Sequence, residues 1–383
     1  MAEGYLLPSL RYTVLSTTGV PVSGAKVYAY AAGTTTKINT YTTAALSVAN
    51  ANPIIADSAG RILAFLTPGV AYDFVVNDAS DVLMYSTLNV IGSGLGSASS
   101  RTVVGGRITG VSGSAVADTT ATTSIYYTPY LGNQIGLYDG TSWTLVTFTE
   151  TALALGIDTA STVYDLFVWS NSGTLALERL AWASATARAT ALTTQDGILV
   201  KSGDPTRRYR GTYRTTAAPG TTADSPRQRL IWNNENRVAR PMRVLEATDS
   251  WTYQTATYRQ ANGSTTNQVE LVQGIAECAV SLSLTVIVSN TAANVSTIVA
   301  IGEDATTGPA TGSVGFLMDS QVAPLRYQVS ARLDKSPAIG YHFYPWLEYS
   351  SAVGTTTWLG DGGAAPLIQS GMTGMWEGYC GDD

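Results

Sequence analysis

The segment Gly19-Val-Pro-Val-Ser-Gly-Ala-Lys-Val-Tyr-Ala-Tyr-Ala-Ala-Gly-Thr-Thr-Thr36 opens residues 19–89, where short apolar runs are separated by turn residues. Ala25, Val27 and Ala29 fall on one face of an extended chain, and polar or aromatic side chains fall on the other. Alternation with a period of two residues predicts a strand with one buried face. Residues 1–91 are therefore expected to form a small β-sandwich.

A strong turn signal lies further along this region, at Pro68-Gly69. Proline presets φ at the second position of a turn, and glycine accepts a positive φ at the third. The flanking segments, residues 61–66 and 71–76, are expected to pair as a hairpin.

Two pieces of this region, Tyr28-Ala-Tyr-Ala-Ala-Gly-Thr34 and Asp57-Ser-Ala-Gly-Arg61, carry a resemblance. Together with Ala51-Asn-Pro-Ile-Ile55, they resemble the N-terminal module of many tailed-bacteriophage tail fibres, tailspikes and related appendages. The resemblance covers about the first quarter of the chain. It implies that the module attaches the protein to the virion. The candidate docking residues are Tyr28, Tyr30, Asp57, Arg61 and Tyr72.

The composition of the 383 residues indicates an all-β protein with extensive interfaces. Hydrophobic residues make up 45% of the chain, which is typical of a packed protein, but charged residues make up only 13%. Much of the polar surface is expected to consist of threonine, a residue that favours strands. The 37 glycines and 14 prolines supply turns. So few charges also favour large subunit interfaces, because few charged groups need to be desolvated.

Charge and cysteine content bear on the classes of partner and cofactor. The net charge of −6 is opposite in sign to that of a typical duplex-DNA binder, so no nucleic acid partner is expected. Cys278 and Cys380 have no metal-ligand spacing, so reduced thiols and no cofactor are expected. The N-terminus lacks a signal-peptide pattern. No apolar run approaches the ~20 residues that cross a bilayer, so no membrane partner is expected.

The composition changes after Ile91 and predicts a linker over residues 92–123. It begins with the Gly/Ser-rich segment 92–100, a composition typical of flexible linkers. Within it, residues 102–111 are either a strand shared between subunits or a tethered β-ribbon. Residues 124–383 are then a larger β-rich distal domain of jelly-roll or sandwich type, with a sub-boundary near residue 265.

Turn signals organise the distal domain. Asp139-Gly140, Asn171-Ser-Gly173 and Asp196-Gly197 each predict a hairpin, whereas residues 150–155 are expected to form one or two helical turns. Apolar and alternating runs predict the later strands, at 250–255, 268–273, 280–289, 296–301, 312–318, 325–333, 339–349 and 355–359. Residues 124–265 resemble a domain of phage and prophage appendage proteins, a resemblance that implies no chemistry.

The distal domain has an asymmetric charge distribution. From Arg179 to Arg243 there are twelve Lys/Arg and four Asp/Glu, whereas from Val244 to Asp383 there are four Lys/Arg and thirteen Asp/Glu. The basic segment could bind phosphate or nucleic acid, or an anionic glycan, or pair with the acidic half in the same chain or in a neighbouring subunit. The last interpretation is favoured, because arginine suits partly buried carboxylate pairs. The candidate inter-subunit or ligand contacts here are Arg207, Arg208, Arg210 and Arg214.

An aromatic cluster between residues 341 and 358 is a second candidate contact surface. Tyr341, Trp346 and Trp358 could stack on sugars, but aromatic side chains tend to be buried, so a core strand or a subunit interface is favoured. The lone His342 is expected to be a packed or surface residue, because no nucleophile motif accompanies it. No pair of carboxylates is singled out for glycoside hydrolysis, and no enzyme activity is expected.

The combined expectation is a structural appendage protein of a tailed phage, a tail or neck (collar) fibre, located in the virion after assembly in the bacterial cytoplasm. Its partners would be tail, neck or portal-adaptor proteins, and copies of itself in a homotrimer, as the resemblance implies. The alternatives are a glycan-binding receptor-binding protein with a host surface glycan as partner, a depolymerase, and a capsid decoration or head-spike protein.

Overall fold

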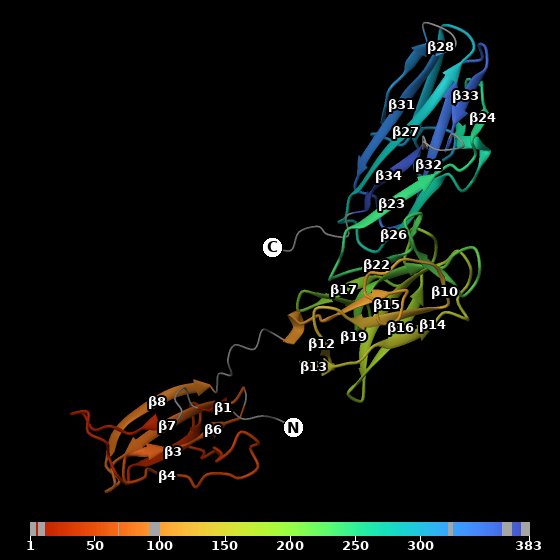
Figure 1. Cartoon of the computed structure of the whole chain (residues 1–383). Coiled ribbons are helices and arrows are strands. Elements are labelled where there is room, and N and C mark those ends of the chain that lie inside the picture. The colour runs from red at the N-terminus through yellow and green to blue at the C-terminus, as the bar shows by residue number, and fades with distance from the viewer. Residues whose placement is uncertain are drawn as a thin grey trace. The chain divides into compact units, whose positions relative to one another are not determined.

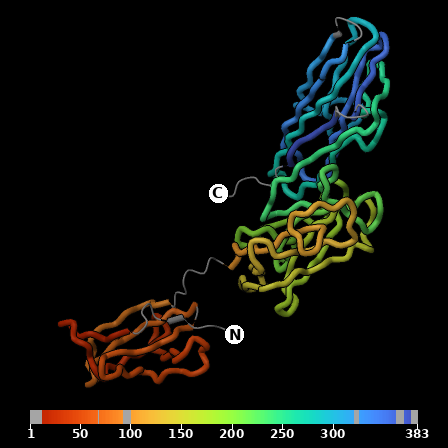
Figure 2. The backbone as a smooth tube through the Cα atoms, in the orientation of Figure 1, coloured from red at the N-terminus to blue at the C-terminus, as the bar shows by residue number. Residues whose placement is uncertain are grey.

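The computed structural model describes residues 12–67, 69–91, 100–320, 325–361 and 370–376, and the backbone of residues 5–6 (Figures 1 and 2). The chain divides into two compact units, Met1–Ala98 and Ser99–Asp383. The described residues contain no α-helix, only the 3₁₀ turns η1 (Ser100–Thr102) and η2 (Ala261–Gly263). The all-β prediction is therefore confirmed. Within these residues, no helix has the length and apolar character needed to cross a bilayer.

The first unit is a β-sandwich built on one sheet of order β4-β3-β7-β8. The strand pairs β1-β6 and β2-β5 complete it. The bounds are β1 (Tyr5–Leu6), β2 (Tyr12–Thr13), β3 (Lys26–Ala31), β4 (Ile54–Ile55), β5 (Arg61–Ile62), β6 (Phe65–Leu66), β7 (Ala71–Asn77) and β8 (Leu83–Ile91).

The alternation of β3 is present in the structure: Val27 and Ala29 are buried, and Tyr28 and Tyr30 lie on the other face. Burial of Val27 with Phe74 of β7 contributes to a core that belongs to this unit alone. The predicted hairpin between 61–66 and 71–76 is wrong, because β5 and β6 pair with β2 and β1, whereas β7 pairs with β3 and β8. Pro68 lies outside the described residues.

The early strands of the second unit form three complete sheets, of orders β14-β11-β9, β12-β13 and β16-β15-β19-β18-β17. They also supply the first three strands, β10-β20-β21, of a larger sheet. Their bounds are β9 (Gly106–Thr109), β10 (Thr119–Thr122), β11 (Ser124–Pro129), β12 (Gln134–Tyr138), β13 (Trp143–Thr147), β14 (Thr151–Ala154), β15 (Val163–Asn171), β16 (Thr174–Ala181), β17 (Leu192–Gln195), β18 (Ile198–Lys201), β19 (Asp204–Arg214), β20 (Thr222–Asp224), β21 (Gln228–Arg229) and β22 (Ile231–Asn233), the last paired with β19.

The later strands complete a pair of sheets of orders β10-β20-β21-β26-β32-β28-β30 and β23-β34-β27-β31-β29 (Figure 1). Their bounds are β23 (Arg240–Leu245), β24 (Ser250–Thr252), β25 (Arg259–Gln260), β26 (Gln268–Gln273), β27 (Val280–Asn290), β28 (Val295–Ile301), β29 (Val314–Gly315), β30 (Met318–Ser320), β31 (Leu325–Lys335), β32 (Gly340–Ser350), β33 (Thr356–Leu359) and β34 (Gly371–Trp376).

The predicted linker is too long. Residues 92–99 lie outside the described residues, but η1, β9 and β10 belong to the second unit. Strand β9 is buried along its whole length and pairs with β11 of the same chain, from Gly106 opposite Pro129 to Thr109 opposite Tyr126. The segment 102–111 is therefore neither a tethered ribbon nor, in this structure, a strand given to another subunit.

The three predicted hairpins of the second unit are confirmed as β12-β13, β15-β16 and β17-β18. The predicted helical turn at 150–155 is wrong, because Thr151–Ala154 forms β14 and pairs with β11. A single hydrophobic core includes Trp232 and Trp251 before residue 265 and Val269 and Leu282 after it, so the structure has no boundary there.

Candidate docking surface and buried arginine network

Two of the candidate docking residues, Tyr28 and Tyr30, meet on the outer face of the first unit's sheet. Their rings stack with centroids 6.3 Å apart, and Lys37 Nζ lies 5.0 Å from the centroid of Tyr28. The Tyr28 hydroxyl donates to Asp81 at 2.9 Å, and Lys26 pairs with the same carboxylate at 3.4 Å. These contacts hold Tyr28 in place and leave a flat, partly exposed aromatic surface beside charged groups.

Asp57 and Arg61 shape a turn and lie elsewhere in the unit. Asp57 Oδ1 accepts from the backbone N–H groups of Ala59 and Arg61, both at 2.9 Å, and Oδ2 accepts from Arg61 Nε at 3.0 Å. Gly60 within this turn has φ +72°, and a Cβ there would lie 2.9 Å from the backbone nitrogen of Val22. The Asp-Ser-Ala-Gly-Arg segment is thus explained by the turn it forms.

The expectation that Tyr72 contacts a docking partner is wrong, because its side chain is buried in the core of the first unit. Its hydroxyl accepts from Thr67 N–H at 3.0 Å and donates to the carbonyl of Asn39 at 3.2 Å. Tyr72 therefore ties two loops to the sheet, a structural role.

Strand β8 is an exposed feature that the sequence interpretation missed. It lies at the edge of the sheet, with β7 as its neighbour among the described strands. Leu83, Leu88 and Ile91 of β8 are exposed, Leu88 by 68%. Apolar side chains along an unpaired sheet edge are a usual site of protein–protein contact. The sequence does carry a signal for this surface. Residues 83–91 form an uncharged run of nine residues that lacks the strict alternation of a half-buried strand.

Beside β8, a cleft leads into the sandwich. The hydroxyls of Tyr12 and Tyr85 hydrogen bond at 2.9 Å across it. An open groove of about 470 Å³ lies outside this pair, lined by Leu15 and Met84 among others. An apolar cavity of about 90 Å³, lined by Val27 and Phe74 among others, lies on the inner side. The two tyrosines line both spaces.

The arginines of the basic segment are engaged within the second unit. Arg208 and Arg210 of β19 are fully buried, and both reach Glu235, at 3.4 and 2.5 Å. Arg207 reaches Glu178 at 2.6 Å and lies over the ring of Trp169. No ligand-binding role is needed to explain these side chains, because each has a carboxylate partner.

Arg214 stacks on Tyr341, with its guanidinium carbon 3.7 Å from the ring centroid. This cation–π contact joins the basic segment to the later strands, but it is not the pairing with a carboxylate that the charge distribution led us to expect. Most other partners differ from the expectation, because Glu178 and Glu235 precede residue 244 and do not belong to the acidic half. Arg227–Glu270 and Arg237–Glu277 are ion pairs that do reach the acidic half.

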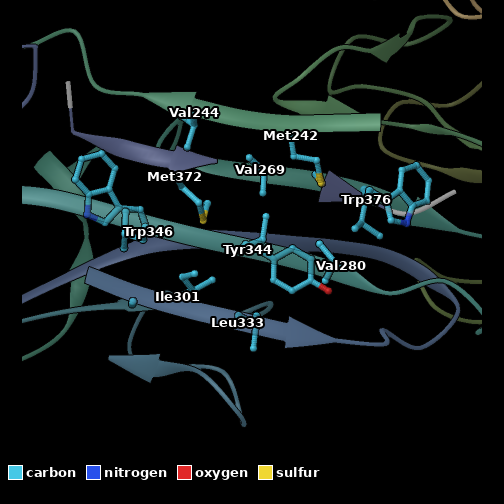
Figure 3. Packing of buried hydrophobic residues seen from close by; sticks show 14 of the residues in the cluster. Met242, Val244, Val269, Val280, Ile301, Leu333, Tyr344, Trp346, Met372 and Trp376 are labelled. Carbon is cyan, nitrogen blue, oxygen red and sulfur yellow. The ribbon is translucent and has the colours of Figure 1, made fainter. Parts of the chain in front are cut away.

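Trp346 and Trp358 are fully buried, so a sugar-stacking role for them is wrong. Figure 3 shows Trp346 among the buried hydrophobic residues of the second unit. Trp346 packs edge-on against Trp251, with centroids 6.0 Å apart, and Trp358 donates its indole N–H to the carbonyl of Tyr253 at 3.0 Å. Tyr341 is half-buried under Arg214. The favoured alternative of a core strand is confirmed for these two tryptophans.

His342 is a packed residue, as expected. Its ring nitrogens lie 2.7 Å from Asp304 Oδ2 and 3.1 Å from the carbonyl of Ala338. Both nitrogens therefore have structural partners. In the described ranges, no group of three or more His, Cys, Asp or Glu side chains is arranged to hold a metal ion. Cys278 is buried, and Cys380 lies outside these ranges.

Glu348 is a fully buried carboxylate in the core of the second unit. It accepts from Trp251 Nε1, Arg259 Nε and the backbone N–H of Asn262, at 2.8, 2.8 and 3.2 Å. Burial raises the pKa of Glu348 from 4.5 to about 7, because it outweighs the opposing effects of Trp251 and Arg259.

The pKa of Glu348 predicts a pH-dependent stability. The folded state holds this proton more tightly than the unfolded state, so stability is lost as the pH rises from about 4.5 to about 7. The loss should be at most about 3 kcal/mol. Urea unfolding measured from pH 5 to 8 gives the free energy of unfolding at each pH. We expect the Glu348→Gln variant to lack the part of its decline that comes from titration of Glu348.

A matched control for this measurement is Glu246→Gln. Hydrogen bonds from Asn267 and Thr248 outweigh burial and hold the pKa of Glu246 below its ordinary value. The Glu246→Gln variant should therefore keep the decline between pH 5 and 7. An equal decline in wild type and Glu348→Gln would show that Glu348 does not titrate in this range.

No protein-family model matches the sequence, and no curated protein matches it. Solved structures with some likeness include a tryptic core variant of the Bacillus thuringiensis toxin Cry1Da, at 8% identity over 66% of this chain and 48% of that chain, with a TM-score of 0.18. The chain thus spans about half the length of that toxin core. Infectious bursal disease virus structures of the Gt and Gx strains match at 13% and 9% identity, over 99% and 98% of this chain and 75% and 74% of those chains, with TM-scores of 0.22 and 0.19. TM-scores this low do not indicate a shared fold.

Proposed function

We propose that this chain is a structural appendage protein of a tailed-phage virion, a tail or neck (collar) fibre, without enzymatic activity. Its first unit docks on tail, neck or portal-adaptor proteins, and its second unit projects from the particle. The observation that carries the proposal is that both pieces of the resemblance, 28–34 and 57–61, lie in one compact unit with a core of its own. A unit with its own core can act as a separate attachment module.

Two surfaces of the first unit support docking. The stacked pair Tyr28 and Tyr30 offers aromatic area, and aromatic residues are enriched at protein interfaces. The β8 edge offers exposed Leu83 and Leu88 together with backbone groups at the margin of the sheet. A partner strand added to such an edge gains main-chain hydrogen bonds and apolar contacts at once.

The second unit supports a mechanical role. The candidate arginines of β19 and the lone histidine are engaged in contacts within the unit, and the tryptophans that suggested glycan binding lie in its core. These groups therefore give no support to an enzyme or to sugar stacking at Trp346 or Trp358.

Association of copies as a homotrimer is part of the proposal. Val314, Phe316 and Leu317 form an exposed apolar run, with Phe316 63% exposed. The run connects β29 and β30, which lie at the margins of the two large sheets. Burying such a run between copies removes apolar surface from water.

Incorporation into particles tests the proposal. We expect a chain without residues 1–98 to be absent from purified particles, and Leu88→Glu to reduce incorporation strongly, because it places a charge on the docking edge. The matched control is Ile157→Glu, on the second unit, where the side chain is 87% exposed. Mass spectrometry of purified particles measures how much of each variant is incorporated. Normal incorporation of the truncated chain would contradict the proposal.

A further inference from the structure

His342, the one histidine of the chain, lies between two hydrogen-bond acceptors. Its Nδ1 is 2.7 Å from Asp304 Oδ2, and its Nε2 is 3.1 Å from the carbonyl oxygen of Ala338. Neither a carboxylate nor a carbonyl can donate a hydrogen bond. Only the imidazolium form carries a proton on both ring nitrogens, so only this form satisfies both contacts.

The two acceptors belong to different connections. Asp304 lies in the connection from β28 to β29, and Ala338 lies in the connection from β31 to β32. Asp304 also bonds β32 directly, because its N–H donates to the carbonyl of Phe343 at 2.9 Å and its Oδ1 accepts from Phe343 N–H at 3.0 Å. The ring of His342 adds a side-chain contact that ties the first connection to β32.

The charges next to the ring balance only when the ring is protonated. Glu303 and Asp304 come from the connection after β28, and Lys335, the last residue of β31, pairs with Glu303. With a protonated His342 this cluster holds two carboxylates and two cations. Loss of the ring proton leaves Asp304 without a cationic partner among the described residues.

The other elements packed against the ring add no charge that faces it. On β26 the residue opposite the ring is Leu271, and β28 and residues 336–339 include no titratable side chain. The carboxylate of Glu270 accepts from the hydroxyl of Tyr341 at 3.0 Å, on the opposite face of β32. Tyr344, on the same face as the ring, is a neutral phenol, because burial raises its pKa.

The protonation of His342 is linked to stability. Burial lowers the pKa of His342, but the hydrogen bond and the charge of Asp304 outweigh burial, so the pKa lies above the ordinary 6.5. The folded state thus holds the proton more tightly than the unfolded chain does. The stability that this contact contributes is fully present below pH 6.5 and is lost as the pH rises through the raised pKa.

We propose that His342 is a pH-sensitive contact, which in its imidazolium form holds residues 302–305 against β32 and loosens them when the ring loses a proton. The side chain of His342 is 7% exposed and that of Asp304 is 41% exposed, so the proton can exchange with solvent. The connection held in this way leads to the exposed apolar run at Val314 and Phe316. The inference is independent of the proposed virion function.

Nuclear magnetic resonance of the full chain, labelled with carbon-13 at histidine, tests the protonation state directly. The single histidine gives one ring signal, which should titrate with a midpoint above pH 6.5. Asp304→Asn removes the charge but keeps an oxygen that can accept from Phe343 N–H. This variant should lower the midpoint by about one pH unit or more. A wild-type midpoint at or below pH 6.5 would overturn the proposal.

Hydrogen exchange of the full chain tests whether the contact holds residues 302–305. The amides of Asp304 and Phe343 should be protected more strongly in wild type than in Asp304→Asn below the midpoint, by about tenfold or more. Above the midpoint the two proteins should exchange alike. Comparing them at each pH cancels the intrinsic pH dependence of exchange. A ratio between them that does not change with pH would also overturn the proposal.

The matched control is Asp334→Asn, which removes the same charge from the residue before Lys335. Asp334 is 52% exposed and contacts Ser281 and Arg332. The control should keep the wild-type midpoint and the wild-type exchange of residues 302–305. If Asp334→Asn lowered the midpoint as much as Asp304→Asn, net charge would explain the shift and the specific contact with Asp304 would be refuted.

Discussion

Replacing Glu235 with glutamine is expected to lower the free energy of unfolding by about 3–5 kcal/mol. Glu235 is the carboxylate partner of both Arg208 and Arg210, whose side chains are 2% and 0% exposed. Arg208 also donates to the carbonyls of Arg101 and Gly136, whereas Arg210 forms its ion pair, among the described residues, with Glu235 alone. Without that charge, two buried cations lie side by side in β19.

Glu178→Gln is the matched control. Glu178 also bridges two cations, Lys201 and Arg207, and its 28% exposure is close to the 27% of Glu235. Its partners, however, are 24% and 20% exposed, so solvent can hydrate them. This change should cost about 1 kcal/mol or less. Urea unfolding measures the loss of free energy of unfolding in both variants. Equal losses in Glu235→Gln and Glu178→Gln would show that the burial of Arg208 and Arg210 does not determine the loss of stability.

Trp346→Ala is expected to cost about 3–5 kcal/mol of stability, because it removes a fully buried aromatic side chain from the core. Figure 3 shows Trp346 in the same cluster as Met372 and Tyr344. Trp358→Ala should have a similar effect, since Trp358 is equally buried. Chemical unfolding gives these values directly.

Trp169→Ala serves as the control for this prediction. Trp169 is only half-buried, and the guanidinium carbon of Arg207 lies 4.0 Å from the centroid of its ring. Loss of the Trp169 side chain should therefore lower the free energy of unfolding much less. If Trp346→Ala kept wild-type stability but lost binding on a glycan array, the core role argued above would be wrong, and sugar stacking would regain support.

Local patterns were sufficient to predict several of the hairpins and long strands of this protein. The segment 268–273 matches the bounds of β26, and Asp139-Gly140 and Asp196-Gly197 each mark a hairpin of the second unit. These predictions hold because hairpin turns and alternation depend on neighbouring residues only. The core role of Trp346 was also favoured from the sequence, because large aromatic side chains are usually buried.

The errors concern contacts between distant residues. Residues 102–123 have the composition of a linker, but β9 is buried because it pairs with β11 and because the side chain of Asn233 bonds the backbone of Ile108. Charge counts located the basic segment but not its partners. Glu235 lies within that segment, and only the fold brings it to Arg208 and Arg210.

The candidate docking surface was predicted in part. The alternation around Tyr28 and Tyr30 placed both on the outer face of the sheet, as observed. Tyr72 was named for docking, but it is buried because it lies with Phe74 and Val76 on the inner face of β7. Strand β8 was missed as a surface, because its edge position depends on the order of strands in the sheet.

Imaging of intact particles by electron cryomicroscopy tests the central proposal most directly. We expect density for the sandwich of residues 12–91 to lie against a tail, neck or portal-adaptor protein, and density for residues 100–376 to project away from the particle. Particles in which this chain is absent, or in which its second unit makes the attachment and its first unit is free, would contradict the proposal.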